Sequence, residues 1–317
     1  MREQDPQISS ARAGSGKSLQ LPATFSEARH PRALLITINT GHEDYTKALV
    51  VSLSKLDGFL DLSVLIVDNA SGDAAVAALR KEIADLTNVR LLVASANLGY
   101  FGAARFGAED YISRGNALPD WLIVCNNDVL IDDKEFLEKL FRHDPLKVGV
   151  IGPRIQTPLK AEQNPYMQQR PGWKKQLGFR LCSSNYGAAL VRDWLYYKKQ
   201  SLKSWIGGTV PRAHPAENEN AGLQPIYAAH GSFMIFSRKF FDDGGYFDEN
   251  LFLNGEEISV AEICRSLRLP VVYDSTLSVQ HYEHVTVGAH MTRSMFEIHR
   301  KSMRYVLSTY LSGRECQ

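Results

Sequence analysis

Carboxylate and amide side chains come directly after short apolar runs at two places in the first half of the chain. Asp68 and Asn69 follow one run, and Asn127 and Asp128 follow another. A carboxylate at the end of a buried strand can hold a hard divalent cation, which in turn neutralises a diphosphate. A carboxylate beside an amide can also bind a nucleobase or ribose edge. Each pattern alone is equally typical of a turn or a helix N-cap.

Three further titratable side chains stand out in the second half. Glu256 and Glu257 open a predicted helix, and His281 ends a short predicted strand. One of the carboxylates could act as a general base if burial or like charge raises its pKa. The opposing interpretation is that the pair complements the helix dipole, which favours the ionised form. His281 is either a single metal ligand or a structural histidine.

A glycine-containing segment, 97–107, provides a candidate phosphate contact. Its glycines are spaced GxxGxxxxG, which is not the dinucleotide fingerprint GxGxxG. Small residues that open a helix allow a ligand to approach closely, and the helix N-terminus favours an anion. Arg105 adds a positive charge that could pair with a phosphate. The alternative is an ordinary turn with a surface arginine.

The elements that position these residues follow from an alternation of apolar runs with helical periods. This alternation predicts an α/β fold with a Rossmann-like, mostly parallel sheet covered by helices, in which ligands bind at the carboxyl ends of the strands. A final amphipathic helix is expected to pack against the domain. The predicted strands are 33–38, 62–67, 89–94, 121–125, 226–236, 271–273 and 277–281, and the predicted helices are 45–56, 74–86, 256–267 and 292–311.

Composition limits the class of protein. The 317 residues carry 36 basic and 35 acidic side chains, a net charge of +1, and 44% of them are hydrophobic. This balance excludes a disordered, collagen-like or strongly basic nucleic-acid-binding chain, and no nucleic acid partner is expected. Four cysteines without a CxxC pair favour a reducing compartment. The apolar runs are too short for a membrane span and no secretory signal is evident, so we expect a cytoplasmic protein with at most peripheral membrane contact.

Two segments differ from the rest of the chain. Residues 1–31 are polar and aperiodic, which predicts a flexible tail, and Ala11 stands where their GSGKS motif would need the first glycine of a P-loop. Residues 160–213 hold ten basic and two acidic side chains, together with three of the four tryptophans. For this basic, aromatic insertion we favour an acceptor site or a membrane-facing surface over a solvated loop.

The order of these motifs from about Ala33 to His284 resembles family 2 glycosyltransferases of the GT-A fold, especially the bacterial polysaccharide and rhamnosyl-transferring branch. The resemblance implies a metal held by Asp128 and His281. It implies a catalytic base at Glu257, in place of the family's aspartate, with Glu256 as the alternative. The expected nucleotide-binding residues are Thr37, Asn39, Asp68, Asn69, Asn97, Gly99, Arg105 and Asn127, and Arg105 stands where the family often has asparagine.

The reaction that the resemblance implies is an inverting transfer of a hexosyl or rhamnosyl group. The donor is a nucleoside-diphosphate sugar, the acceptor is a hydroxyl of a saccharide or lipid-linked saccharide in surface polysaccharide synthesis, and the cofactor is Mn²⁺ or Mg²⁺. The alternative is a degenerate, non-catalytic relative that acts as a sugar-nucleotide sensor or scaffold. We expect a GT-A domain over 32–290, with a nucleotide-binding half (32–130) and an acceptor half (131–290), followed by a C-terminal helix within 291–317. The expected acceptor contacts are His230, Gly231, Trp173 and Trp205.

Overall fold

A continuous apolar run forms the first strand, β1 (Ala33–Asn39), in which every residue is buried. It pairs in parallel with β2 (Leu62–Asp68) on one side and with β4 (Trp121–Asn126) on the other, and β3 (Val89–Val93) pairs in parallel with β2. Strands of a parallel sheet are covered on both faces, which is why they lack a polar alternation. The computed structural model describes residues 33–158, 161–191, 223–282 and 292–312.

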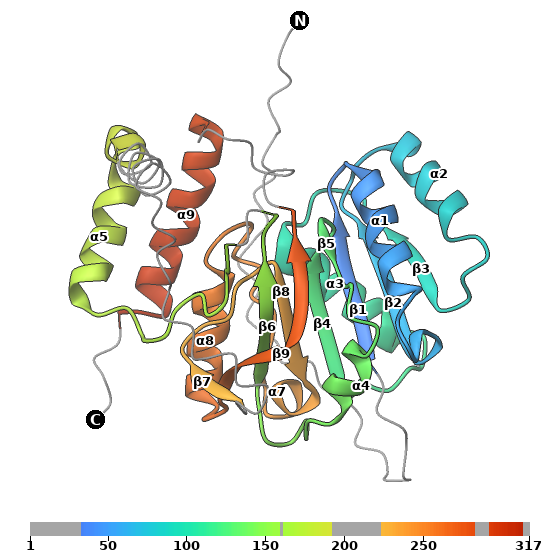
Figure 1. The fold of residues 1–317 in the computed structure, drawn as a ribbon. Helices are drawn as coiled ribbons and strands as arrows, with labels where there is room; N and C mark the ends of the chain where they lie inside the picture. Colours follow the sequence, from blue (N-terminus) through green and yellow to red (C-terminus); the bar gives the residue numbers. More distant parts are fainter. Residues whose placement is uncertain (1–32, 159–160, 192–222, 283–291, 313–317) are drawn as a thin grey trace, which may run out of the picture.

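The second half of the sheet mixes strand directions (Figure 1). Its order is β3-β2-β1-β4-β8-β6-β9-β5, with β7 also paired to β9. The strands β6 and β9 pair in parallel. The pairs β4 with β8, β6 with β8, β5 with β9, and β7 with β9 are antiparallel. The α/β fold with a helix-covered sheet is confirmed, and the uninterrupted parallel part is β3-β2-β1-β4. The remaining strands are β5 (Val129–Leu130), β6 (Val150–Gln156), β7 (Gln224–Ile226), β8 (Phe233–Ser237) and β9 (Val271–His281).

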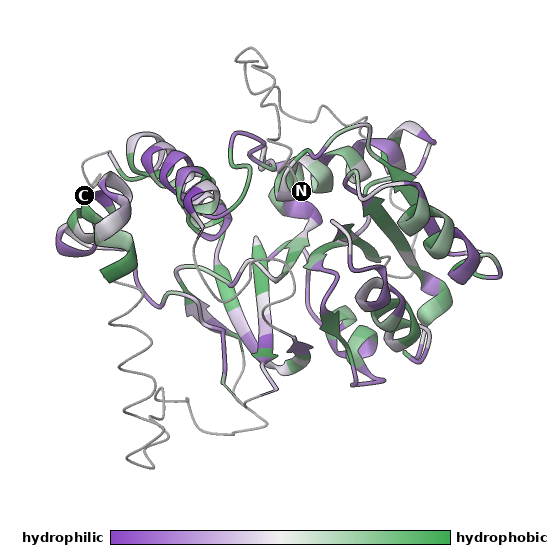
Figure 2. Cartoon of the chain, turned by 90° about the horizontal axis from the view of Figure 1, so that it is seen from above, coloured by the Kyte–Doolittle hydropathy of each residue, from purple (hydrophilic) through white to green (hydrophobic). Residues whose placement is uncertain are grey.

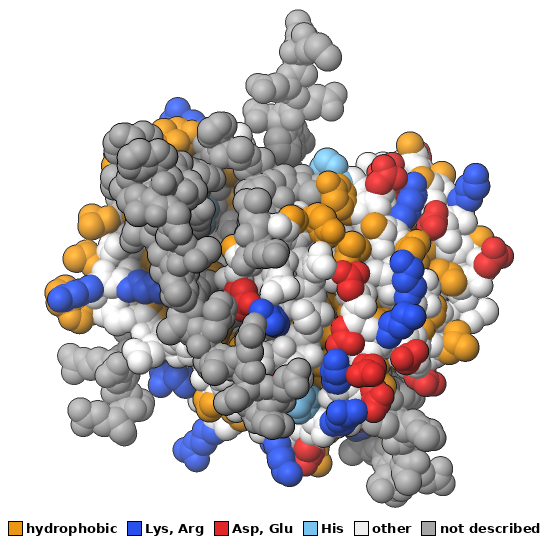
Figure 3. All heavy atoms as spheres, viewed as in Figure 1, with side chains coloured by type: hydrophobic (Ala, Val, Ile, Leu, Met, Phe, Trp, Pro, Cys, Tyr) orange, Lys and Arg blue, Asp and Glu red, His pale blue; other side chains and the backbone are white. Residues whose placement is uncertain are grey.

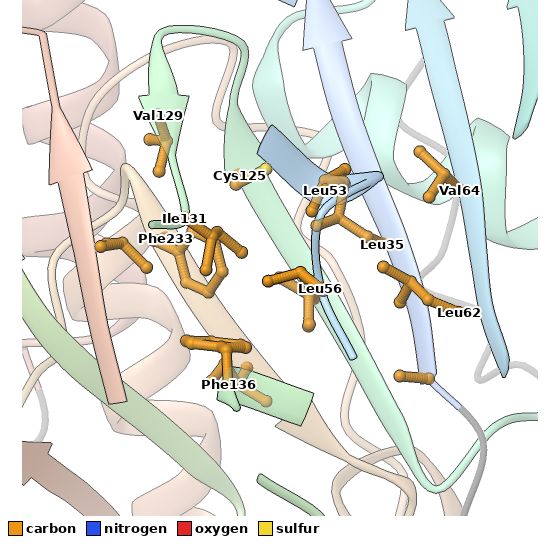
Figure 4. Packing of buried hydrophobic residues seen from close by; sticks show 14 of the residues in the cluster. Leu35, Leu53, Leu56, Leu62, Val64, Cys125, Val129, Ile131, Phe136 and Phe233 are labelled. Atoms are coloured by element: carbon orange, nitrogen blue, oxygen red, sulfur yellow. The ribbon is translucent and has the colours of Figure 1, made fainter. Parts of the chain in front are cut away.

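Helices bury apolar side chains against both faces of the sheet. Figure 4 shows one of these two cores, in which Leu53 of a helix lies over Leu35 and Cys125 of neighbouring strands. Burying each such leucine contributes about 1.5–3 kcal/mol. The helices on this face are α1 (Glu43–Leu53), α2 (Asp73–Glu82) and α4 (Phe136–Phe141), and a short 3₁₀ helix spans Phe59–Asp61. The helices on the other face are α3 (Tyr100–Ser113), α7 (Arg238–Asp242) and α8 (Glu256–Ser266).

The helices α9 (Arg293–Thr309) and α5 (Trp173–Ser184) lie outside this three-layered core. The predicted C-terminal amphipathic helix is confirmed as α9, and it packs through Val306 and Leu307 on the outer side of α8. The helix α5 in turn contacts α9. Figure 1 shows the two helices side by side and apart from the strands. Figure 2 shows that hydrophobic residues are concentrated in the strands. No helix in the described ranges is both long and apolar enough to cross a membrane.

The structure differs from the predicted strands in two places: one predicted strand is interrupted, and two other predicted strands form one continuous strand. The segment 226–236 is divided between β7 and β8, and the residues between them form a bend. The backbone of Ala228 pairs with Met167 and the N–H of His230 donates to Asn164 Oδ1 at 2.7 Å, so this part of the chain leaves the sheet. The predicted strands 271–273 and 277–281 form the single strand β9.

Some of the predicted segments lie outside the described residues. These are the tail 1–31 and, within the insertion 160–213, residue 160 and residues 192–213. The division of 32–290 into nucleotide-binding and acceptor halves stays a prediction. The sheet itself runs through both halves without interruption, since β4 pairs with both β1 and β8.

Candidate active site

The turn between β4 and β5 brings Asp128 beside His281 of β9. Val129 is the register partner of His281, and the N–H of Tyr282 donates to the Asp128 carbonyl. Both side chains are buried, and Asp128 Oδ1 lies 3.2 Å from His281 Nε2. In the part of the chain that the structure describes, Asp128 Oδ1 has no partner in hydrogen-bonding geometry. A buried carboxylate oxygen without a hydrogen-bond donor is stabilised by a nearby positive charge, which a bound metal ion could supply.

Gln163 controls which nitrogen of His281 faces Asp128. The Gln163 side-chain oxygen lies 2.7 Å from His281 Nδ1. An amide oxygen can only accept, so Nδ1 carries the ring proton. In the neutral ring Nε2 then turns its lone pair toward Asp128, and the Asn126 amide nitrogen lies 3.4 Å from the same Nε2. A lone pair and a carboxylate oxygen therefore face each other as two potential ligands.

These two atoms fit a divalent cation such as Mn²⁺ or Mg²⁺. Adjacent ligands of an octahedral ion with bonds of about 2.1 Å lie about 3.0 Å apart. The observed separation of Asp128 Oδ1 and His281 Nε2 is 3.2 Å. The described residues hold no cluster of three or more His, Cys, Asp or Glu side chains that could bind a metal. A two-ligand site suits an ion that keeps several waters and takes oxygens from a phosphate.

We expect Gln163→Leu to lower the affinity for Mn²⁺ by about 10- to 100-fold, because His281 loses the acceptor that fixes its tautomer and orientation. Gln163→Glu keeps an acceptor at Nδ1 and is the matched variant, which should retain most of the affinity. Electron paramagnetic resonance of added Mn²⁺ measures binding without any turnover. Equal affinities of Gln163→Leu and the unchanged protein would contradict the orienting role.

Asn39, at the end of β1, is the centre of a buried polar cluster. Its amide nitrogen donates to Asp68 Oδ1 at 2.8 Å and to Ser71 Oγ at 2.9 Å, and its oxygen accepts from Thr46 Oγ1 at 2.8 Å. Asn127 donates to Thr46 Oγ1 at 3.0 Å. Three of the predicted nucleotide-binding residues, Asn39, Asp68 and Asn127, therefore meet at the carboxyl ends of β1, β2 and β4.

The Asp68 side chain stabilises the turn that follows β2. The second Asp68 oxygen accepts from the Ser71 N–H at 3.1 Å. The following helix, α2, begins after Gly72, which provides no side-chain cap. Asp68 therefore builds a turn at the rim of the site, and the helix-cap interpretation is wrong.

Asn69 links the end of β2 to the start of α3. It donates to Asn97 Oδ1 at 2.9 Å, and the same oxygen accepts from the Gly99 N–H at 2.9 Å. Gly99 has a φ of 75°, and a Cβ there would lie 2.4 Å from the carbonyl oxygen of Phe252, so only glycine fits. The N–H of Tyr100 donates to that carbonyl at 3.0 Å. The start of α3, where the predicted nucleotide-binding residues Asn97 and Gly99 lie, is thus joined to the loop that precedes α8.

Glu256 and Glu257 begin α8, and their side chains differ in exposure. Glu256 is 4% exposed and its Oε1 has no hydrogen-bond partner among the described residues, whereas Glu257 is partly exposed. Burial raises the pKa of both carboxyls, and the charge of Glu257 raises the pKa of Glu256 further. Burial and crowding thus outweigh the backbone groups at the helix start, which favour the ionised form. The pair has the electrostatic character that a general base requires.

The bend between β7 and β8 joins these carboxyls to the candidate metal site. A Cβ on Gly231 would lie 3.0 Å from Glu257 Oε1, so the absence of a side chain makes room for the carboxyl. The Gly231 carbonyl accepts from the Tyr100 hydroxyl at 2.8 Å. The ring of His230 has its centroid 6.0 Å from that of His281. Residues from four segments that are distant in the sequence therefore line one site.

We expect Glu256→Gln to stabilise the fold at alkaline pH. The folded-state pKa of Glu256 lies above the unfolded value, so between the two values folding binds a proton and the free energy of unfolding falls as pH rises. Glutamine abolishes this loss, a gain of about 1–3 kcal/mol at pH 9. Near pH 4 the carboxyl is protonated in both states and no gain is expected. Thermal unfolding of both proteins across this pH range is the measurement, and parallel curves would contradict the assignment.

Comparison with known proteins places the chain in a family. Residues 33–245, more than half of the chain, match the model described as Glycosyl transferase family 2. The chain belongs to this family. The match ends before α8, so Glu256, Glu257 and His281 lie beyond it.

A relative of this glycosyltransferase is the N-acetylglucosaminyl-diphospho-decaprenol L-rhamnosyltransferase of Mycobacterium tuberculosis. The two are 28% identical over 262 residues, which cover 80% of this chain and 76% of the relative. Among solved structures, GalNAc-T7 with UDP, GalNAc and Mn²⁺ matches with a TM-score of 0.57 and 12% identity, over 89% of this chain and 49% of that one. TarS 1-349 of S. aureus in complex with UDP-GlcNAc matches with a TM-score of 0.50 and 12% identity, over 90% and 68% of the chains. The structural likenesses show the GT-A fold.

Four predicted site residues of the glycosyltransferase are not gathered with the others. Thr37 is fully buried within β1, opposite Cys125 of β4, and stands two residues before the strand end. Arg105 forms ion pairs with Glu109 at 2.7 Å and Glu249 at 2.9 Å, which compensate its charge. Trp173 lies on α5 at the outer edge of the molecule (Figure 1). Trp205 lies outside the described residues.

Two residues of the site escaped sequence reasoning. Gln163 contacts His281 across 118 positions, and Tyr100 reaches Gly231 across 131. Tyr100 is the residue after Gly99, a predicted site residue, and this adjacency in the sequence could have suggested that Tyr100 lies in the site. Glutamine in a polar insertion carries no signal of its own.

Proposed function

We propose that the protein transfers a sugar, with inversion, from a nucleoside-diphosphate sugar to a hydroxyl of a lipid-linked saccharide in surface polysaccharide synthesis. Family membership supports sugar transfer. The name of the mycobacterial relative, an L-rhamnosyltransferase with a diphospho-decaprenol-linked acceptor, supports a rhamnosyl donor and a lipid-linked acceptor. The first donor to test is therefore deoxythymidine-diphosphate rhamnose, and the second is a uridine-diphosphate hexose.

The continuity between α8 and the candidate metal site carries this proposal. The Glu257 carboxyl packs on Gly231, whose neighbour His230 faces His281, the partner of Asp128. A base and a cation site thus lie on either side of one bend. This arrangement suits a reaction in which a hydroxyl is deprotonated at one end while a diphosphate leaves at the other.

In the proposed reaction Glu257 removes the proton from the acceptor hydroxyl as that oxygen attacks the anomeric carbon. The bond from this carbon to the diphosphate oxygen breaks, and the nucleoside diphosphate leaves with the electron pair. A bound divalent ion at Asp128 and His281 supplies charge neutralisation for that leaving group. A single base therefore suffices, unlike in glycosidases, which need two opposed carboxyls. Glu257 fits the role better than Glu256, since its side chain is the partly exposed one.

The cluster around Asn39 serves the proposed nucleotide site by holding its rim. Asn39 and Asp68 are fully buried and bond to each other, so they shape the turn after β2. Asn97 and the Phe252 carbonyl fix the start of α3 by accepting from the N–H groups of Gly99 and Tyr100. We propose that nucleoside and phosphate lie along these two turns, toward Asp128.

A screen of nucleoside diphosphates by thermal shift, with and without Mn²⁺, followed by a transfer assay with the bound donors, tests the function. Stabilisation that depends on both nucleotide and Mn²⁺, with release of the nucleoside diphosphate in the presence of an acceptor, is expected. Binding without transfer or hydrolysis of any donor would instead support the non-catalytic sensor. The replacement of the family's aspartate by Glu257 favours that alternative, whereas the raised pKa of this glutamate favours the enzyme.

A further inference from the structure

The helix α5 presents an apolar stripe to solvent. Trp173, Leu177 and Leu181 are spaced four residues apart, so they lie along one side of the helix. They are 70%, 48% and 57% exposed. The helix makes its interior contacts with other residues, since Phe179 packs on the cluster that contains α9 and Ser183 is buried. We call Trp173, Leu177 and Leu181 the α5 stripe.

Basic side chains surround the α5 stripe. Lys174 and Lys175 are exposed at the start of the helix. Arg180 of α5 and Arg304 of α9 line a groove of about 430 Å³ between the two helices, together with the serines 183, 184, 308 and 312. Among the described residues, neither arginine has an ion-pair partner. In Figure 3 hydrophobic and basic side chains lie together at the left edge, where α5 stands in Figure 1, and acidic ones gather toward the opposite side.

We propose that the α5 stripe and the adjoining groove form a docking surface for a bilayer of anionic phospholipid. The α5 stripe enters the interface between headgroups and acyl chains, and Arg180 and Arg304 bind headgroup phosphates. An interfacial helix combines such an apolar side with flanking Lys and Arg, and tryptophan prefers this depth. The 12 residues of α5 are too few to span the roughly 30 Å of a hydrocarbon core. The helix therefore lies in the plane of the surface.

A chain of bonds would couple a membrane-docked α5 to the helix α8. Arg170, just before α5, pairs with Glu262 of α8 at 2.6 Å and donates to the Tyr310 carbonyl beyond the end of α9. Glu262 also accepts from the Tyr227 hydroxyl at 2.8 Å. These bonds join the outer helices to the helix that carries Glu256 and Glu257.

Cosedimentation of the full chain with vesicles tests the docking surface. Vesicles of phosphatidylcholine with about one third phosphatidylglycerol should bind the protein at low salt, and the affinity should fall at least tenfold in 0.5 M salt, where the Debye length is only a few Å. Leu177→Glu with Leu181→Glu should lose at least tenfold in affinity. Leu60→Glu is the matched control, because Leu60 is a 79% exposed leucine far from α5 in sequence and should have no effect.

A second pair of variants tests the phosphate contacts. Arg180→Gln with Arg304→Gln should weaken binding about tenfold, whereas Lys147→Gln at another exposed site should not. Failure of the unchanged protein to bind anionic vesicles at low salt overturns the proposal, as does binding that survives both stripe substitutions. Competition by millimolar inorganic phosphate would show a site for free anions and would also overturn it. These assays contain neither donor nor acceptor, so their outcome is separate from that of the transfer assay.

Discussion

Glu257→Gln should lower kcat for sugar transfer by about 10²- to 10⁴-fold and leave nucleotide binding unchanged. A positioned general base contributes about 10²–10⁴ in rate, and glutamine keeps the size of the side chain while it cannot accept the proton. The packing on Gly231 is preserved, since amide and carboxyl have the same shape. The measurements are transfer rates with saturating donor and calorimetric titration with nucleoside diphosphate.

Two variants make the result for Glu257 specific. Glu138→Gln changes an exposed glutamate on α4 and should leave the rate unchanged. Glu256→Gln should retain transfer within about tenfold, because Glu256 is buried and its raised pKa keeps it protonated without a charge to lose. Near-normal turnover of Glu257→Gln would end the assignment of the base. If Glu256→Gln were the inactive variant, the two roles would be exchanged.

Asp128→Asn should lower kcat/KM by about 10³-fold, the equivalent of about 4 kcal/mol of lost transition-state stabilisation. The amide removes the negative charge that faces His281 Nε2 at 3.2 Å, and with it the charged ligand of the candidate cation site. The additional nucleotide affinity that Mn²⁺ confers should disappear. Binding without Mn²⁺ should persist, because the cluster around Asn39 does not bond to the Asp128 side chain.

Calorimetric titration of nucleoside diphosphate, with and without Mn²⁺, separates these two contributions for Asp128→Asn. Asp132→Asn is the matched control. Asp132 lies four residues further on and bonds to Gln280 at the surface at 2.6 Å, so this variant should keep both transfer and the Mn²⁺ effect. A Mn²⁺ effect of normal size in Asp128→Asn would show that the cation binds elsewhere.

The strands and their polar ends were predictable because their signals are local. β1, β2 and β4 are buried on both faces, so each reads as a short apolar run that ends in a polar turn. The edge strand β3 is only partly buried, but four of its five residues are apolar. The side chains that follow parallel strands lie at one edge of the sheet, and this rule placed Asn39, Asp68 and Asp128 in one region. The strands β5 and β6 and the helices α4, α5 and α7 were not predicted.

The site could not be completed from the same signals, because its contacts join residues that are distant in the chain. His230 and Gly231 were predicted within a strand, but backbone bonds to Met167 and Asn164 turn them out of the sheet toward α8. The interpretation of Glu256 and Glu257 was open in the sequence, since helix dipole and burial shift a pKa in opposite directions. Packing of α8 between the sheet and α9 buries the pair and raises both values.

Residue types, their order and the periodicity of burial are properties of the chain itself, and they were enough for the fold class and for most of the polar residues of the site. The charge balance of Arg105, the tautomer of His281 and the exposure of the α5 stripe depend on which side chains come within a few Å of one another. Hydrogen bonding, ion pairing and burial act over such short distances. Their outcome is therefore settled by packing, which brings together residues that are distant in the sequence.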